Sequence, residues 1–514
     1  IGKPRKGYFA RYSVNWKNGA GITPIAIELA CFREKMGKRM PWEHGAATPM
    51  DHFKNIARAF WPEDAGTGQV GYIWNDWADK MLKAACENQY LGIAGSSGSG
   101  KSEFFALWAV INFLSDPMNT IILTTARTLV LSRLKVWGKV VKYWTPLKEI
   151  GVPGKLLDSV GTIRYIDAKG DASQGDMAGI KLIPSEPKQE KESIGTIRGI
   201  HQKTVIFVAD DMPDLSKSIM EGVGNLSSGC ERFQFIGLGN DPSLFNALGD
   251  MMQPEMGKPL TLEHKEWISA KNVHCLRLDA WDSPNIKHKD KFTGLVRQSD
   301  IDNLVARKGE NSPSVWIQLH GLHPPEGCSN TVLSEAALIR FHCFESVTWK
   351  KDYTTSAALD PAFGGDSCIF RTFKRGNDTQ GKMKILCDEI LTIPIIANDP
   401  LPADYQIATK VKELCISRRI PPDEFIVDST GIGRGVAAIL QREWSPRIES
   451  CNFGGSPTDR IVGEENPVPA DKEFDRFVTE LWFSVRQFVE SDILRGLDQP
   501  TAVQLCSRTY EDKG

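Results

Sequence analysis

The chain has 514 residues, more than one hydrophobic core usually supports, and 41% of them are apolar, so we expect at least two globular domains. Lysine and arginine number 62 and aspartate and glutamate 64, a balance too even to indicate a nucleic-acid partner from overall charge. The 11 cysteines form no paired motif, and no apolar run approaches the ~20 residues that cross a bilayer. We therefore expect no disulfide framework, no membrane span and a reducing, intracellular compartment.

Residues 1–70 are rich in Trp, Gly and Pro and lack a sustained period, which predicts an irregular N-terminal extension or a small helical cap. Residues 71–311 alternate short apolar strands with helices, which is typical of a mostly parallel α/β sheet. The pattern predicts strands at 90–94, 120–125, 204–209 and 232–237, and helices at 101–114, at 127–144 and from Pro242.

The first of these strands runs directly into a phosphate-binding sequence of the form G-x-x-x-x-G-K-S. Its glycines let backbone N–H groups surround phosphates, Lys101 supplies a positive charge to the outer phosphates, and the Ser102 hydroxyl can bind Mg²⁺. A Gly/Ser linker that matches by chance is the alternative. We predict an ATP and Mg²⁺ site formed by Gly95, Ser96, Ser97, Gly98, Ser99, Gly100, Lys101 and Ser102.

Polar residues follow two later strands of the same region. Asp210 and Asp211 end the apolar strand 204–209, where we predict that Asp210 binds Mg²⁺ through water and Asp211 acts as the general base. Both acids could instead cap the following turn. Asn240 follows the strand 232–237 and is predicted to contact the phosphates and report hydrolysis, although Asn-Asp-Pro is also a common turn sequence.

Proline and glycine turns between 312 and 349 predict a linker region, and a second α/β pattern occupies 350–514. Its strands are expected at 355–359, 367–373, 383–390 and 425–427, and its helices at 403–417, 434–444 and 471–490. Asp360 and Asp428 each end one of these strands. Carboxylates from neighbouring strand ends are what two-metal phosphodiester hydrolysis requires, although a single strand-end Asp is more often a turn former or helix cap.

The ATPase half of phage large terminases resembles this chain in the order of four motifs: the P-loop, Thr124-Thr125-Ala126-Arg127, Ile197-Arg198-Gly199 and Gly239-Asn240-Asp241-Pro242. Two departures stand out. The family usually has Asp-Glu where this chain has Asp210-Asp211, and many members carry an Arg inside the P-loop. A charge-neutralising Arg is therefore expected elsewhere, with Arg198 and Arg127 as candidates beside their ordinary role in surface ion pairs.

The second half resembles the terminase nuclease, which has an RNase H-like fold, at Leu359-Asp360-Pro361, 364–366, 427–435 and 453–457. This resemblance implies that Asp360 and Asp428 bind Mg²⁺ or Mn²⁺. It also places a third acid in an Asp-rich segment, which we expect beyond Gly514. Asp471, Glu473 and Asp475 are possible substitutes, but acids that open a helix are also favoured by its dipole.

Taken together, the resemblance implies a P-loop ATPase domain followed by an RNase H-like nuclease domain. The expected function is a viral motor that cuts concatemeric double-stranded DNA and pumps it into a procapsid in the host cell cytoplasm. The resemblance also implies a portal protein and a small terminase subunit as partners, and a homo-oligomeric, pentameric ring. Two alternatives remain open: a helicase or repair ATPase fused to a resolvase-like nuclease, and an ATP-dependent assembly switch that binds DNA without cutting it.

Overall fold

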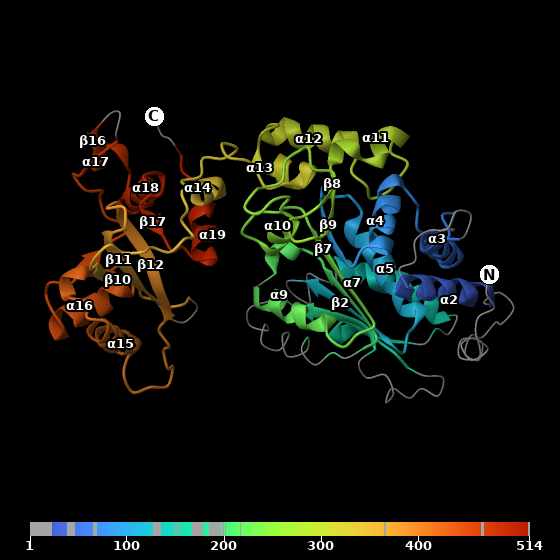
Figure 1. Cartoon of the computed structure of the whole chain (residues 1–514), viewed down its shortest axis with the longest axis horizontal. Coiled ribbons are helices and arrows are strands. Elements are labelled where there is room, and N and C mark those ends of the chain that lie inside the picture. The colour runs from blue at the N-terminus through green and yellow to red at the C-terminus, as the bar shows by residue number, and fades with distance from the viewer. Residues whose placement is uncertain are drawn as a thin grey trace. The chain divides into compact units, whose positions relative to one another are not determined.

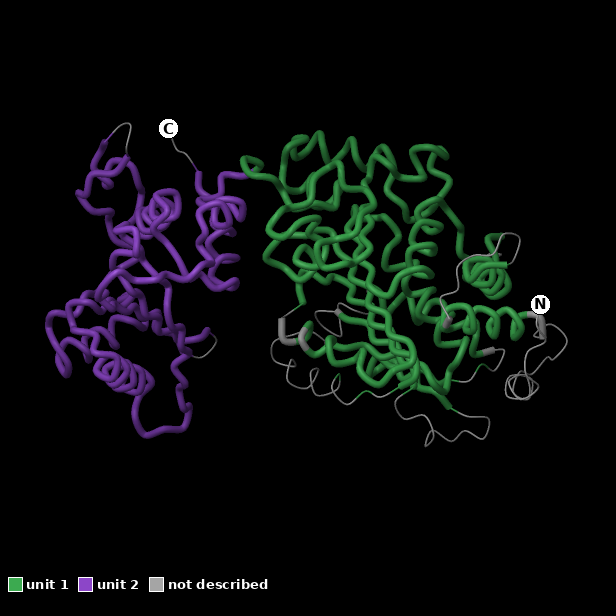
Figure 2. The backbone as a smooth tube through the Cα atoms, viewed as in Figure 1, with its two compact units in different colours: residues 1–328 green, residues 329–514 purple. Residues whose placement is uncertain are grey.

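A computed structural model of the chain divides into two compact units, Ile1–Cys328 and Ser329–Gly514 (Figure 2). The division lies inside the range 312–349, where turns predict a linker. Among the described helices, none has the length and hydropathy needed to cross a membrane. The structure describes residues 23–38, 47–64, 69–126, 135–149, 152, 154–166, 178–184, 197, 200, 202–215, 217–363, 366–463 and 467–511.

Unit 1 is built on a nine-stranded sheet in the order β3-β4-β5-β2-β6-β7-β1-β9-β8 (Figure 1). Within this order the six adjacent strands β5, β2, β6, β7, β1 and β9 are parallel. Antiparallel strands are added at both edges. The predicted mostly parallel sheet is therefore confirmed. Its strands are β1 (Tyr90–Gly95), β2 (Thr120–Ala126), β3 (Lys155–Leu157), β4 (Thr162–Arg164), β5 (Gly179–Pro184), β6 (Thr204–Ala209), β7 (Arg232–Gly239), β8 (Glu266–Ile268) and β9 (His274–Leu278).

Helix α5 (Lys101–Ser115) follows β1 and is buried on almost every side, as expected for a helix that is apolar all round. It contacts α7 (Val136–Glu149) and also α2 (Thr23–Lys38) and α3 (Pro49–Phe60). The rings of Phe53 and Phe32 pack on Trp108 of α5, with centroids 5.3 and 5.9 Å away. The described part of the first 70 residues is thus a helical cap, the second of the two predicted forms.

Further helices of unit 1 are α4 (Asp76–Glu87), α9 (Lys217–Gly224), α10 (Ala247–Met252), α11 (Pro284–His288), α12 (Gln298–Lys308) and α13 (Pro313–Val315). The prediction of a helix from Pro242 was wrong. Residues 240–246 are irregular, and α10 begins only after Asn246, whose side chain accepts a hydrogen bond from the amide of Gly249 at 2.9 Å. An amide side chain in this position satisfies a free N–H of the first turn and so fixes the start of the helix. The predicted helix 127–144 overlaps α7, but its first residues, 127–134, lie outside the described residues.

The beginning of the predicted linker belongs to unit 1. After α13 the chain forms one π-helical turn, Trp316–His320, and then Gly321 with φ of +64°. The amide of Ser97 donates to the carbonyl of Gln318 at 2.7 Å, and a Cβ on Gly321 would lie 2.4 Å from the Cα of Gly95. Residues 316–321 therefore support the loop that leaves β1.

Unit 2 contains a six-stranded sheet in the order β14-β13-β10-β11-β12-β17. Strand β11 is antiparallel to both β10 and β12, whereas β10, β13 and β14 are mutually parallel neighbours. The order β12-β11-β10-β13-β14, with only β11 reversed, is that of the RNase H-like fold, as predicted. The strands are β10 (Thr354–Asp360), β11 (Ile369–Asn377), β12 (Met383–Thr392), β13 (Phe425–Asp428), β14 (Glu449–Cys451) and β17 (Leu494–Arg495).

Helices α15 (Ala403–Ser417) and α16 (Gly433–Glu443) pack on each other and share a core with β10 and β13. Helices α14 (Glu335–Arg340), α18 (Phe477–Glu490) and α19 (Gln499–Ser507) form a second group in which α14 contacts the other two (Figure 1). The hairpin β15 (Ile461–Val462) and β16 (Val468–Pro469) leads into α17 (Ala470–Glu473). The single helix predicted for 471–490 was wrong, because Phe474 is extended and separates α17 from α18.

Gly321→Ala should weaken unit 1 by about 2–4 kcal/mol, because the new methyl group meets the backbone of Gly95 and the left-handed conformation strains alanine. The matched control is Gly327→Ala, which is also left-handed but has open space around its Cβ position. That variant should lose only about 1 kcal/mol. Urea unfolding measures both free energies, and equal losses would contradict the tight contact.

Candidate functional site

The loop between β1 and α5 contains two left-handed glycines and leads directly into a helix. Gly98 and Gly100 have φ of +75° and +78°, a left-handed region that favours glycine, and Lys101 begins the helix directly afterwards. The first amides of a helix have no partner within it, and the helix dipole favours an anion at this end. The loop therefore presents backbone N–H groups at the start of α5, as a phosphate site does.

Lys101 is buried against this loop, with 7% of the residue exposed. Its Nζ donates to the carbonyls of Gly95 at 2.8 Å and Ser96 at 3.1 Å, and to the Ser99 hydroxyl at 2.9 Å. Burial lowers the pKa of Lys101 to about 8, because a charged ammonium loses hydration inside the protein. An anion in the cavity would supply the counter-charge that this ammonium needs.

Asn240 directly follows β7 and contacts the P-loop. Its Oδ1 accepts a hydrogen bond from Lys101 at 2.9 Å, and its Nδ2 donates to the Ser97 hydroxyl at 3.0 Å. The position follows from the sheet, because β7 is the parallel neighbour of β1 and both strands end at the same edge. The next residue, Asp241, has its Oδ1 2.8 Å from Nδ1 of His323.

Asp210 follows β6 and is buried, with 5% of the residue exposed. The Ser102 hydroxyl donates to its Oδ1 at 3.0 Å. Burial and the neighbouring charge of Asp211 raise the pKa of Asp210. A serine hydroxyl beside a carboxylate is a set of hard oxygen donors that suits Mg²⁺, which commonly takes one or two protein ligands and completes its shell with phosphates and water. The two residues thus fit the metal that the sequence implies.

Asp211 is partly exposed and adopts φ of +51°, an uncommon conformation outside glycine. Its carboxylate forms an ion pair with Lys135, immediately before α7. Asp210 and Asp211 both reach the same cavity from the end of β6.

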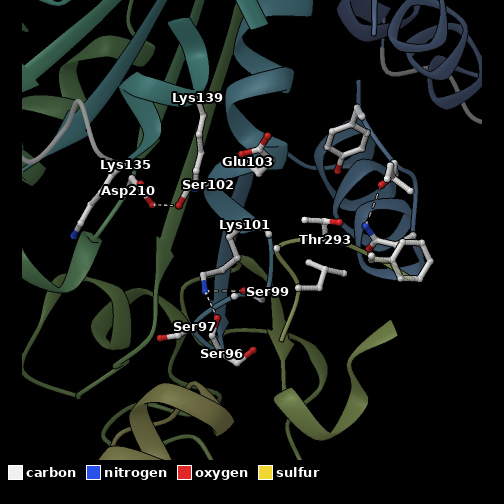
Figure 3. Close-up of a pocket in the computed structure, with 18 of the residues that line it drawn as sticks. Ser96, Ser97, Ser99, Lys101, Ser102, Glu103, Lys135, Lys139, Asp210 and Thr293 are labelled. Atoms are coloured by element: carbon white, nitrogen blue, oxygen red, sulfur yellow. Dashed lines mark hydrogen bonds between the residues drawn. The ribbon is translucent and has the colours of Figure 1, made fainter. Parts of the chain in front are cut away.

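These side chains surround one cavity of about 720 Å³ (Figure 3). Two parts of its wall were not predicted from the sequence. One is the pair of segments 71–75 and 292–295, which carry Tyr72 and Phe292; the other is a row of lysines beside and on α7. The row could have been noticed from its helical spacing, but nothing in the sequence shows what a lysine faces. The predicted Arg198 and Arg127 lie outside the described residues. The lysines that line the cavity are Lys101, Lys135, Lys139 and Lys142.

A second polar site lies in unit 2, where β10 and β13 run parallel with Leu359 opposite Val427. Asp360 and Asp428 are the next residue of each strand, so the sheet brings them to the same edge. Burial and the charges of Asp428 and Asp366 raise the pKa of Asp360. Asp428 accepts a hydrogen bond from the amide of Thr430 at 2.8 Å. Two neighbouring carboxylates at a strand edge are hard oxygen donors of the kind that divalent cations prefer.

The possible substitutes for a third acid have local partners. Asp475 accepts from the Thr479 hydroxyl at 2.7 Å, and Asp471 lies 3.9 Å from the ammonium of Lys472. Within the described ranges, no group of three or more His, Cys, Asp or Glu side chains is arranged to hold a metal ion. The paired carboxylates therefore stand without a third ligand in this part of the chain.

Fold and sites together define a P-loop α/β unit followed by an RNase H-like unit with an acidic pair. No protein-family model matches the sequence, and a search of curated proteins finds no significant match.

Similar solved structures include large terminases of bacteriophages. The large terminase of a thermophilic bacteriophage, in complex with ADP, is 12% identical, with 86% of this chain and 92% of that chain covered and a TM-score of 0.33. The bacteriophage HK97 large terminase is 11% identical, covers 87% and 90%, and has a TM-score of 0.40. The Phi-28 gp11 DNA packaging motor is 10% identical, covers 85% and 99%, and has a TM-score of 0.30. At such identities and scores these structures assign no role to any residue here.

Asp428→Asn should raise the melting temperature at pH 8 in the presence of EDTA by about 1–2 °C, a small gain because water screens the pair. The raised pKa of Asp360 means that its charge opposes folding above that pKa. The gain should therefore fade as pH falls toward the ordinary carboxyl value of 3.8. Differential scanning calorimetry between pH 4 and 8 tests this. The exposed Asp459→Asn is the control, and an equal gain in both variants would refute repulsion at the pair.

Proposed function

We propose that this chain is a viral DNA-packaging motor in which unit 1 hydrolyses ATP to move double-stranded DNA and unit 2 cuts concatemeric DNA with Mg²⁺ or Mn²⁺. The observation that carries the proposal is the cavity in which the P-loop, the Ser102–Asp210 pair and Asp211 meet. Its chemistry suits a nucleoside triphosphate with Mg²⁺, and the same chain carries the acidic pair of unit 2.

In unit 1 each residue has a separate task. The loop amides and Lys101 bind the phosphates, and Ser102 and Asp210 hold Mg²⁺, which supplies charge neutralisation when bound. Asp211 orients the attacking water and accepts its proton. Asn240 contacts Lys101 and Ser97 and is therefore placed to respond when the outer phosphate leaves.

In unit 2, Asp360 and Asp428 would hold the catalytic metal ions, which activate water and stabilise the leaving oxygen of a phosphodiester when bound. Strands β10 and β13 share a buried core with α15 and α16, and this core fixes the positions of the two strand-end carboxylates. No covalent nucleophile is required. A divalent ion held by these residues would offset the negative charges of the two carboxylates.

The assembly in which this motor works is proposed from the sequence resemblance alone. It comprises double-stranded DNA, a portal protein, a small terminase subunit and a pentameric ring of this chain in the host cell cytoplasm. Stimulation of ATP turnover by procapsids separates a packaging motor from a helicase or repair ATPase. Cleavage of plasmid DNA with Mn²⁺ separates both from an assembly switch that only binds DNA. A packaging assay with purified procapsids and protected DNA is the direct test.

Lys101→Ala should lower ATP turnover at least ~100-fold, because the outer phosphates lose their buried counter-charge. Nicking of plasmid DNA by unit 2 should stay within about twofold, since its metals are bound in a separate unit. Both activities are measured on the same preparation, with the exposed Lys155→Ala as the control. Normal turnover by Lys101→Ala would disprove the nucleotide site, and a parallel loss of nicking would disprove the independence of the two sites.

Asp211→Asn should keep the affinity for ATP but slow its hydrolysis by about 100-fold or more, because an amide cannot accept the proton of the attacking water. Equilibrium binding of a fluorescent ATP analogue and single-turnover hydrolysis separate the two effects. Asp214→Asn, an exposed acid in the next turn of the same segment, is the matched control. Hydrolysis at the wild-type rate in Asp211→Asn would place the base elsewhere.

A further inference from the structure

The cavity of unit 1 has a row of ammonium groups on one side. Lys135, Lys139 and Lys142 occur at a spacing of four and then three residues, which places them on one face of α7 and its preceding turn. All three line the cavity that contains the P-loop, and Figure 3 labels two of them, Lys135 and Lys139. Helix α7 also packs on α5, so this face is held at a fixed distance from the phosphate-binding loop.

The outer two lysines have acidic partners. Lys135 pairs with Asp211, and Nζ of Lys142 lies 2.6 Å from Oε1 of Glu103. Lys139, between them, is partly buried, and its ammonium has no ion-pair or hydrogen-bond partner among the residues that the structure describes. A partly buried ammonium without an anionic partner is costly, and it is the arrangement expected where the partner is a ligand.

Lys139 lines the same cavity as the P-loop residues 96–102 and Asp210. The Ser102 hydroxyl donates to Asp210 at 3.0 Å, and Lys101 donates to Asn240 at 2.9 Å, so the residues proposed to bind Mg²⁺ and phosphate meet in this cavity. The ammonium of Lys139 therefore lies on the wall of the space that a bound triphosphate would occupy.

We propose that Lys139 is a further catalytic residue that contacts the outer phosphoryl group and neutralises the charge that develops there during hydrolysis. This inference rests on the proposed ATPase function. Between Gly95 and Lys101 the P-loop contains only Gly and Ser, so it supplies no second cation of its own. Lys139 supplies that cation from the same chain and from the helix that follows β2.

The step balances without any further reactant. The oxygen of water forms a bond to the outer phosphorus while the bond from that phosphorus to the bridging oxygen breaks. The electron pair of the broken bond stays on the bridging oxygen of ADP, and the water proton passes to Asp211. Negative charge is then spread over the outer phosphoryl oxygens, where a nearby ammonium stabilises the transition state more than the bound substrate.

Three variants of the full chain test the assignment. Lys139→Met removes the charge but keeps the aliphatic length, Lys139→Arg keeps a charge, and Lys148→Met is the control, because Lys148 is an exposed lysine in the last turn of the same helix and does not line the cavity. The measurements are kcat for ATP, the Kd of ADP with Mg²⁺, and the Kd of ADP with Mg²⁺ and aluminium fluoride, which imitates the phosphoryl group in transit. The last measurement separates contact with the reacting group from a structural role.

Lys139→Met should lower kcat by about 100-fold and weaken the aluminium fluoride complex by a similar factor, while ADP alone binds within about threefold of wild type. Lys139→Arg should recover most of both losses, and Lys148→Met should stay within about threefold throughout. Wild-type kcat in Lys139→Met, or equal weakening of ADP affinity with and without aluminium fluoride, would overturn the role of Lys139 but leave the proposed ATPase function standing. Absence of turnover in wild type would overturn the proposed function and this residue's role with it.

Discussion

Parallel strand pairing is the constraint on which both sites depend. Strands β1, β7 and β6 are neighbours in that order, every residue after the first in each is buried, and Gln234 is the one polar side chain among these buried residues. Apolar strands covered on both faces can occupy only the interior, so polar residues appear where the strand leaves the sheet. Because parallel strands all leave at one edge, the P-loop, Asn240 and Asp210 meet there, where hydrogen bonds from Lys101 to Asn240 and from Ser102 to Asp210 join them.

Unit 2 repeats this arrangement with a smaller set of groups. Its parallel pair β10 and β13 ends in Asp360 and Asp428, and the antiparallel β11 carries no part of the pair. The charge of Asp360 is unfavourable for the fold itself, because burial and the nearby carboxylates of Asp428 and Asp366 raise its pKa. Such local cost is common where a site is shaped for a ligand rather than for stability. Unit 1 shows the same kind of cost for a group of opposite charge, since Lys101 is a buried cation and its pKa is lowered.

The cavity of unit 1 is rich in positive charge around a small acidic core. Asp210 and Asp211 lie beside each other, and lysines approach from the P-loop and from the face of α7. The proposed ligand, a nucleoside triphosphate with Mg²⁺, would satisfy both kinds of group, because the metal would bind the acid and the phosphates would bind the ammonium groups. The segment 316–321 makes the P-loop more rigid, since Ser97 and Gly95 both contact this segment. A loop that must hold several amides toward one anion benefits from such support.

The sequence alone determined the features that depend only on the local order of residues along the chain. The P-loop is a continuous segment whose glycines, lysine and serine act together, and the strand-end acids follow directly from buried apolar runs. The RNase H-like order was inferred from motifs, and strand pairing confirms it. In contrast, the lysine face of α7, the segments 71–75 and 292–295, and the contact of Gly321 with Gly95 arise only from tertiary packing. The break at Phe474 and the late start of α10 were likewise missed. A helical period shows which residues share a face, but only the packed structure decides what that face meets, because partners distant in sequence leave no mark on local pattern.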